Sequence, residues 1–365
     1  MLALNVGSRT KENNVKGIWD YCLTTRPIND LLPKIAKKEQ SLKEAGIIPS
    51  VVVCGAGAAG TEMSFAFKRR WSDYFGQEIK VTIVGSSERP VPEQPEVTRK
   101  QIIRKMKERN IEYIGNSHVK EITAEGVVLA DGTLIPCTVP VWATGAEPQG
   151  VSAMSDLDLM KGYFRVNKFL QSTSHPNVFA GGDCNTLEDY ADKPYPTKAG
   201  VYAVREGPFI AQNIVNFIEG KPLTEYVPQI GFLSLLMTGD SMSLGSKFGI
   251  CFSGRWVWEL KDYIDMSFMD LFNPEYLFKD YKTKGTAEPI DNFQLFDDQT
   301  EATKKTVEEW KEKVSKMDGA TAAEILACGE DVVFFHDKWQ ILTRMHWEED
   351  FRADVVSHFK PPYYE

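Results

Sequence analysis

A strand that runs directly into a glycine-rich turn constrains this chain more than any other feature. Val51–Cys54 is the strand, the turn carries Gly55, Gly57 and Gly60, and a helix is predicted from Thr61 to Trp71. The first glycine permits the tight turn, the second lets a diphosphate approach the backbone, and the third lets the helix lie close to the strand. The free N–H groups and the dipole of the helix start then hold the phosphate charge. The stretch therefore predicts a dinucleotide site, with an ordinary glycine-rich turn as the alternative.

Composition and charge exclude several classes of protein. The 365 residues suffice for two compact domains and a small third one, and 42% hydrophobic with 25% charged residues is ordinary for a soluble globular protein. A net charge of -9, without a lysine or arginine block, argues against a nucleic-acid partner. No apolar run approaches the roughly 18 residues of a membrane span, and the first residues do not resemble a signal peptide.

The six cysteines have neither a Cys-x-x-Cys pair nor metal-ligand spacing. This pattern predicts free thiols in a reducing compartment, no metal site and no dithiol relay, so we expect a protein of the cytoplasm or of an organelle matrix. Cys184 is the one cysteine beside a candidate ligand-binding residue, Asp183. An inert buried thiol is the favoured interpretation of Cys184, and a redox role is the alternative.

Strands and helices alternate along much of the chain, which predicts an α/β fold with a parallel sheet and right-handed crossovers. A β-hairpin is expected at 126–135, with Asp131-Gly132 at its turn. The predicted helix at 199–219 should be interrupted by Pro208, which would kink it or start a new turn. The other predicted strands are at 2–6, 81–84, 111–114, 139–143, 177–180 and, as short segments, within 230–258; the other helices are at 28–45, 97–108, 256–272 and 301–317.

Four separated motifs resemble those of the pyridine nucleotide-disulfide oxidoreductase superfamily, in the order used there. The turn at 55–60 resembles its NAD(P)H-binding turn, and 126–148, with Val141-Trp142-Ala143-Thr144-Gly145, resembles the return to the FAD domain. Residues 177–183, ending Gly181-Gly182-Asp183, resemble the second FAD motif. Residues 198–208 resemble the flavin-facing helix of one branch of this superfamily. That branch includes the oxidoreductase associated with the enzyme selenide, water dikinase, and it is related to type II NADH dehydrogenases. Residues 254–269 also fit that branch, and the resemblance covers about residues 1–273.

The resemblance implies a Rossmann-like flavoprotein with two dinucleotide-binding domains. The implied activity is FAD-dependent NAD(P)H oxidoreduction, with a quinone or other small molecule as electron acceptor. The expected divisions are a partial FAD domain at 1–47, an NAD(P)H-binding domain at 48–145, the FAD domain continuation at 146–222, a small α+β C-terminal domain at 223–285 and a charged, partly helical tail at 286–365.

The same resemblance assigns roles to individual residues. Asp183 is implied to bind the ribityl chain, while the helix start at Ala199 and the charge of Lys198 would stabilise the reduced flavin. Glu62 is implied to lie near the nicotinamide. A solvated surface lysine is the alternative for Lys198, and an acid that favours the helix dipole is the alternative for Glu62. Lys198 and Glu62 are thus the predicted catalytic residues. The predicted cofactor-binding residues are Gly55, Gly57, Gly60, Ser86, Ser87, Arg89, Thr144, Gly145, Gly182, Asp183, Ala199 and Gly200.

The residues after the strand Val81–Val84 bear on the choice of nicotinamide. An acid roughly 20 residues past the glycines would bind the ribose 2′-OH of NAD. Gly85 stands where that acid is expected, while Ser86, Ser87 and Arg89 are suited to a 2′-phosphate. The pattern favours NADPH, and Glu88 keeps NADH open.

Members of this superfamily begin with their own strand, Gly-x-Gly-x-x-Gly turn and helix for FAD. This chain begins with Leu4–Ser8, which resembles the strand end that normally follows that unit. A first βαβ unit of at least roughly 30 residues is thus missing, which we interpret as a truncated gene model or an isoform. The alternative function is a nucleotide-binding or interaction protein that lacks flavin chemistry.

An apolar stripe of Trp256, Leu260, Ile264 and Leu271 is expected on one C-terminal helix. Its polar face is mostly acidic, a poor match to anionic lipid, so packing on the flavin domain or across a homodimer is favoured over peripheral membrane contact. The charged segment at 301–317 is interpreted as a solvated helix face.

Overall fold

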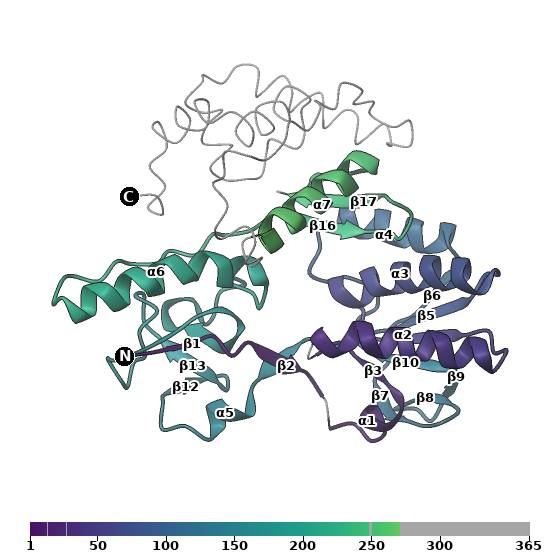
Figure 1. Ribbon diagram of the computed structural model, residues 1–365, viewed down its shortest axis with the longest axis horizontal. Coiled ribbons are helices and arrows are strands. Elements are labelled where there is room, and N and C mark those ends of the chain that lie inside the picture. Colours follow the sequence, from purple (N-terminus) through teal and green to yellow (C-terminus); the bar gives the residue numbers. More distant parts are fainter. Residues whose placement is uncertain (13, 27, 248–249, 271–365) are drawn as a thin grey trace, which may run out of the picture. The chain divides into compact units, whose positions relative to one another are not determined.

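A computed structural model describes residues 1–270 except 13, 27 and 248–249 (Figure 1). The predicted helix at 301–317 therefore lies outside the described residues. The chain divides into two units, which are described separately. The first contains Met1–Pro92 and Arg109–Phe232, and the second contains Glu93–Glu108 and the described residues from Leu233 onward.

A five-stranded parallel sheet organises the first unit. Its order is β3 (Leu23–Thr24), β10 (Val139–Trp142), β4 (Ser50–Cys54), β5 (Lys80–Val84) and β6 (Ile111–Ile114). The β-branched residues of the central strands are buried, as expected where both faces of a parallel sheet are covered. The parallel sheet and the α/β class predicted from the sequence are confirmed.

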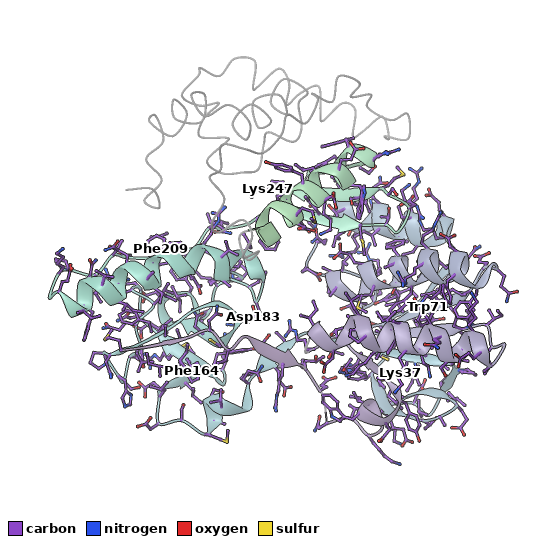
Figure 2. The ribbon with its side chains drawn as sticks, viewed as in Figure 1. Lys37, Trp71, Phe164, Asp183, Phe209 and Lys247 are labelled. Atoms are coloured by element: carbon purple, nitrogen blue, oxygen red, sulfur yellow. The ribbon has the colours of Figure 1, made fainter. Side chains whose placement is uncertain are left out.

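Two long helices accompany this sheet, α2 (Ile28–Glu44) and α3 (Ala58–Phe75) (Figure 1). Helix α3 packs along β4, β5 and β6, and its Trp71 is fully buried (Figure 2). The indole of Trp71 donates a hydrogen bond of 2.6 Å to Glu39 on α2, and Arg70 donates two more to the same carboxylate. These bonds join the two helices and, led by the bond from Arg70, hold the pKa of Glu39 below its ordinary value.

A smaller antiparallel sheet and a short helix, α1 (Ile18–Tyr21), complete this part of the unit. The sheet comprises β7 (Val119–Ile122), β8 (Gly126–Leu129) and β9 (Leu134–Pro136). Strands β8 and β9 form the predicted hairpin, with Asp131 accepting a hydrogen bond of 2.9 Å from the backbone of Thr133 at the turn. Side chains from α1, β4, β8 and β10 share one buried apolar cluster.

The other part of the first unit is built on short strands and one long helix. Strand β1 (Leu2–Leu4) pairs in parallel with β14 (Val178–Ala180). The sheet β12–β13–β15 consists of Leu159–Met160, Tyr163–Val166 and Asn185–Leu187. Helix α6 (Gly200–Ile218) contributes Phe209 to a core that also contains Phe164 (Figure 2).

Helix α6 is not interrupted at Pro208, contrary to the sequence-based expectation. Pro208 lies on the exposed face of the helix. The missing hydrogen bond would have gone to the carbonyl of Val204, a residue that is itself exposed, so water can satisfy that group.

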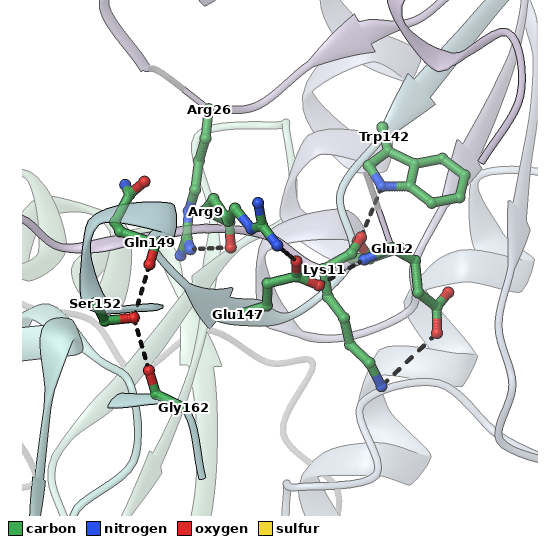
Figure 3. A network of polar contacts seen from close by, with 10 residues as sticks. Arg9, Lys11, Glu12, Arg26, Trp142, Glu147, Gln149, Ser152 and Gly162 are labelled. Carbon is green, nitrogen blue, oxygen red and sulfur yellow. Dashed lines mark hydrogen bonds and ion pairs between the residues drawn. The ribbon is translucent and has the colours of Figure 1, made fainter. Parts of the chain in front are cut away.

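Strands β2 (Ser8–Thr10) and β11 (Ala146–Pro148) pair antiparallel, and neither is among the strands predicted from the sequence. Figure 3 shows the polar contacts that hold this pair. Arg9 forms an ion pair with Glu147, whose carboxylate also accepts a hydrogen bond of 3.1 Å from the backbone of Glu12. The indole of Trp142 donates a 3.0 Å bond to the carbonyl of Lys11. Next to β11, in helix α5 (Gly150–Ala153), the Ser152 hydroxyl lies 2.8 Å from the carbonyl oxygens of Gln149 and Gly162 and shares its one proton between them.

The second unit combines helix α4 (Glu96–Glu108) with an antiparallel sheet and helix α7 (Arg255–Asp270). The sheet is β16 (Ser234–Met237), β17 (Ser243–Lys247) and β18 (Ile250–Gly254), which confirms the predicted short strands. A buried hydrogen bond of 2.9 Å between Thr98 and Ser246 links α4 to the sheet. Within the described residues, no helix combines the length and apolarity needed to cross a membrane.

Candidate functional site

The glycine-rich turn lies between β4 and α3, as predicted. Gly55 has φ +120°, and a Cβ there would lie 2.3 Å from the carbonyl oxygen of Ala143. A Cβ on Gly60 would lie 2.0 Å from the carbonyl oxygen of Gly55. Both positions therefore exclude any side chain. Gly57 is the N-cap of α3 and no side chain caps the helix, so its first N–H groups suit a phosphate.

The loop after β5 carries the residues predicted to distinguish NADPH from NADH. A Cβ on Gly85 would lie 2.6 Å from the Cβ of Ala56 and 2.7 Å from the hydroxyl of Tyr113. The structure thus leaves no room for the ribose-binding acid at that position. Ser86 and Arg89 are exposed and Ser87 is half-buried, with its carbonyl accepting a 2.7 Å bond from Tyr113.

Thr144 and Gly145 follow β10, the strand beside β4, so they lie at the same sheet edge as the glycine turn. Lys11 fixes both residues. Its carbonyl accepts a 2.5 Å bond from the Thr144 hydroxyl, and its N–H donates a 2.7 Å bond to the carbonyl of Gly145. Glu62 lies in the first turns of α3 and is half-buried.

Asp183 lies in the short 3-10 helix η1 (Gly182–Cys184) that follows β14. Ser8 on β2 donates a 2.7 Å hydrogen bond to Oδ2 of Asp183, and a guanidinium nitrogen of Arg26 lies 3.7 Å from the same oxygen. Arg26 also donates to the Ser8 hydroxyl. The other oxygen, Oδ1, accepts no hydrogen bond from the described residues. The side chain is 18% exposed, so a ligand hydroxyl can reach it.

Lys198 and the start of α6 lie beside a small cavity of about 180 Å³. The Lys198 ammonium donates to the carbonyl of Asn185 and lies 4.1 Å from the ring centre of Tyr163. Burial lowers the pKa of Lys198, against the charges of Asp183 and Glu206, which raise it. The surface-lysine alternative therefore fits poorly. The cavity is lined in part by Lys161, Tyr163, Gly182, Lys193, Lys198 and Glu206.

Helix α6 starts where the sequence predicted a helix to start. Ala199 is the N-cap, without a side-chain hydrogen bond to the helix, and Gly200 is the exposed first residue. Cys184 is buried, and that burial raises the pKa of its thiol, which disfavours the reactive thiolate.

Glu206 is the main residue that sequence reasoning missed. It is 1% exposed, and its Oε2 accepts hydrogen bonds of 2.6 Å from the N–H of Gly182 and 3.0 Å from the amide of Asn185. Burial raises the pKa of Glu206 to about 7, although both of these bonds and the charge of Lys198 lower it. A sequence signal existed, because the acid occupies the buried helical face that also holds Tyr202 and Phe209.

The predicted residues fall into two groups of the first unit. Gly182, Asp183, Lys198, Ala199 and Gly200 lie around η1 and the start of α6. The rest lie where β4, β5 and β10 end or where α3 begins. Besides Glu206, the residues added by the structure are Ser8, Arg26, Tyr163 and Asn185.

Comparison with known proteins shows the family and the fold of the chain. A family model described as pyridine nucleotide-disulphide oxidoreductase matches residues 2–207. Ferroptosis suppressor protein 1 of Xenopus tropicalis is 30% identical over 243 residues, which cover 62% of this chain and 62% of that protein. A type II NADH:quinone oxidoreductase of Haemophilus influenzae is 25% identical over 281 residues, covering 68% of this chain and 63% of that protein. The chain thus spans less than two thirds of the length of both curated relatives.

A solved structure of NDH2 from Plasmodium falciparum in complex with NADH superposes with a TM-score of 0.60. The two chains are 16% identical, and the match covers 73% of each. This similarity shows the fold, and it confirms the fold class predicted from the four sequence motifs.

Proposed function

Because the chain belongs to the pyridine nucleotide-disulphide oxidoreductase family, whose model matches residues 2–207, we propose that it is a FAD-dependent NAD(P)H oxidoreductase. We further propose a quinone, or a similar small molecule, as the electron acceptor. The name of the Haemophilus influenzae relative supports this choice, since it specifies NADH and quinone.

The observation that carries the proposal is the position of Asp183. Ser8 and Arg26 both contact Oδ2, while Oδ1 accepts no hydrogen bond from the described residues and is available to a ribityl hydroxyl. The uncapped start of α6 follows Lys198, which is linked to η1 through Asn185. The residues present therefore fit the ribityl and isoalloxazine end of FAD. No second glycine-rich turn for the FAD diphosphate occurs among the described residues.

FAD, when bound, would supply the redox chemistry of the reaction. The chain supplies alignment and charge: Asp183 orients the ribityl chain, and the partial positive charge of the α6 start stabilises negative charge on the pyrimidine edge. Lys198 adds to that positive charge. Glu62 is proposed to lie near the nicotinamide, because it follows the glycine turn on α3.

For the nicotinamide cofactor we propose binding at the turn of Gly55, Gly57 and Gly60, with Thr144 and Gly145 at the same sheet edge. The filled space at Gly85 excludes the acid that would select NAD, which supports a preference for NADPH through Ser86, Ser87 and Arg89. The proposed preference is testable separately from the flavin chemistry.

The full chain, purified and mixed with FAD, should oxidise NADPH or NADH in the presence of a water-soluble quinone. Absorbance at the nicotinamide band measures this directly, and Asp183→Ala should abolish most of the rate. A wild-type protein that binds nicotinamide but not FAD would overturn the proposal. That result would favour a nucleotide-binding protein without flavin chemistry.

A further inference from the structure

Glu206 is an acid on the buried side of a helix, an arrangement that requires an explanation. Its exposure is 1%, and it lies on the face of α6 that also buries Tyr202 and Phe209. Glutamate is almost never fully buried unless it is paired. A carboxylate at this position therefore offsets its desolvation through the groups that it contacts.

The first contact is to the turn that carries Asp183. The N–H of Gly182 donates a 2.6 Å hydrogen bond to Oε2 of Glu206. Gly182 has φ +71°, and a Cβ there would lie 2.8 Å from the side-chain oxygen of Asn5, so the turn is tight. The Glu206 carboxylate thus fixes the residue directly before Asp183.

The second contact leads to Lys198. The side-chain amide of Asn185 donates 3.0 Å hydrogen bonds to Oε2 of Glu206 and to the carbonyl of Ala180. The backbone carbonyl of the same asparagine accepts the Lys198 ammonium. One carboxylate oxygen is therefore connected to the Asp183 turn and to Lys198, two of the features that the resemblance assigns to the flavin.

We propose that Glu206 is a positioning residue, which holds the Asp183 turn and the Lys198 ammonium in the geometry that a flavin requires. The inference rests on the proposed function in that a flavin is the ligand for which the two residues are positioned. Glu206 acts through Gly182 and Asn185, and it needs no contact with the ligand.

The charges around Glu206 make this positioning dependent on pH. Three titratable groups act on Glu206 directly: Lys198 in the segment before α6, and Asp183 and Cys184 in η1. The other titratable residues that line the same cavity are Tyr163 on β13, Lys161, Lys193, Tyr190 and Tyr202. Burial raises the pKa of Glu206 to about 7. Because an ionised acceptor forms stronger hydrogen bonds than a neutral one, the two bonds should tighten as the pH rises through this value.

Hydrogen exchange of the full chain without FAD tests the positioning directly. Glu206→Ala removes the acceptor, Glu206→Gln keeps one, and Glu219→Ala is the matched control on an exposed side chain at the end of α6. Exchange in residues 181–187 should accelerate about tenfold in Glu206→Ala, less in Glu206→Gln and not in the control. Exchange in β4 should stay unchanged in all three variants. Unchanged exchange at 181–187, or an equal increase in β4, would overturn the proposal.

FAD affinity, measured by quenching of flavin fluorescence, then tests the connection to the ligand. Glu206→Ala should raise the Kd about tenfold, and the wild-type Kd should fall from pH 6 to pH 8 while that of Glu206→Gln stays flat. An unchanged Kd in Glu206→Ala would contradict the positioning role. A wild-type chain that fails to bind FAD would instead contradict the proposed function, and the exchange experiment without FAD would still decide the role of Glu206 in the fold.

Discussion

The hydroxyl of Ser8 donates a 2.7 Å hydrogen bond to the carboxylate of Asp183, although 175 positions separate the two residues in the sequence. Ser8 begins β2, and Asp183 follows β14 in the turn η1. The bond joins the first strands of the chain to the turn that we assign to the flavin. It engages Oδ2 of Asp183, whereas Oδ1 accepts no hydrogen bond from the described residues.

Removing either partner should weaken FAD binding to different extents. Asp183→Ala removes the acceptor for the ribityl hydroxyls, and we expect the Kd for FAD to rise about 10- to 100-fold. Ser8→Ala only loosens the orientation of the carboxylate, so it should raise the Kd for FAD about fivefold or less. Titration of each full-length variant with FAD measures both effects. Equal losses in the two variants, or none in Asp183→Ala, would contradict this assignment of roles.

The glycine turn should tolerate no side chain at Gly55. An added Cβ would lie 2.3 Å from the carbonyl oxygen of Ala143 at a backbone φ of +120°, so Gly55→Ala should lose about 3 kcal/mol of unfolding free energy. Gly150→Ala is the control, because a Cβ there has no neighbour within 4 Å. Urea denaturation of both variants measures the difference. A Gly55→Ala variant as stable as the control would show that the turn is not as tight as described.

The elements that the sequence predicted carry local signals. The strand, turn and helix from Ser50 to Phe75 and the hairpin around Asp131-Gly132 follow from β-branched runs, glycine spacing and turn residues. Strands β2 and β11 escaped prediction because each is only three residues long and partly polar, and neither strand alone shows a hydrophobic alternation. Their pairing depends on partners that are distant in sequence.

For the candidate site too, the sequence indicated the residues that lie in local motifs and not those that only the tertiary fold brings together. Asp183 and the glycines belong to compact motifs, so their positions could be found without a structure. Arg26 lies in a segment without a motif, and the resemblance at Leu4–Ser8 assigns no role to Ser8; only the tertiary fold brings the two residues to Asp183. Glu206 did carry a signal, an acid on an apolar helical face, but its contacts to Gly182 and Asn185 could not be deduced from it.

The loop after β5 should determine the preference between the two nicotinamide cofactors. Arg89 is exposed there and suited to a 2′-phosphate, so Arg89→Ala should raise the Kd for NADPH about tenfold and leave the Kd for NADH nearly unchanged. Fluorescence titration with each cofactor gives the two constants. An equal loss of affinity for NADPH and NADH would indicate that Arg89 has a role that does not involve the 2′-phosphate.

Glu206 should also affect the stability of the protein as the pH changes. Its pKa is about 7 in the folded chain and 4.5 ordinarily, so the folded state binds the proton more tightly. The resulting stabilisation is fully present below pH 4.5 and is lost as the pH rises to about 7. As the pH rises across this window, the free energy of unfolding of the wild type should therefore fall by roughly 2–4 kcal/mol relative to that of Glu206→Gln. Denaturation curves at several pH values measure it, and parallel pH profiles would show that the acid stays ionised throughout.

The central claim is that this chain binds a flavin that a nicotinamide can reduce. The most direct measurement is the visible spectrum of the purified full chain after incubation with FAD and removal of unbound FAD, before and after anaerobic addition of NADPH or NADH. We predict about one FAD for each chain and loss of the flavin absorbance band on addition of the nicotinamide. A folded protein that retains no FAD, or whose bound FAD is bleached by neither nicotinamide, would contradict the account.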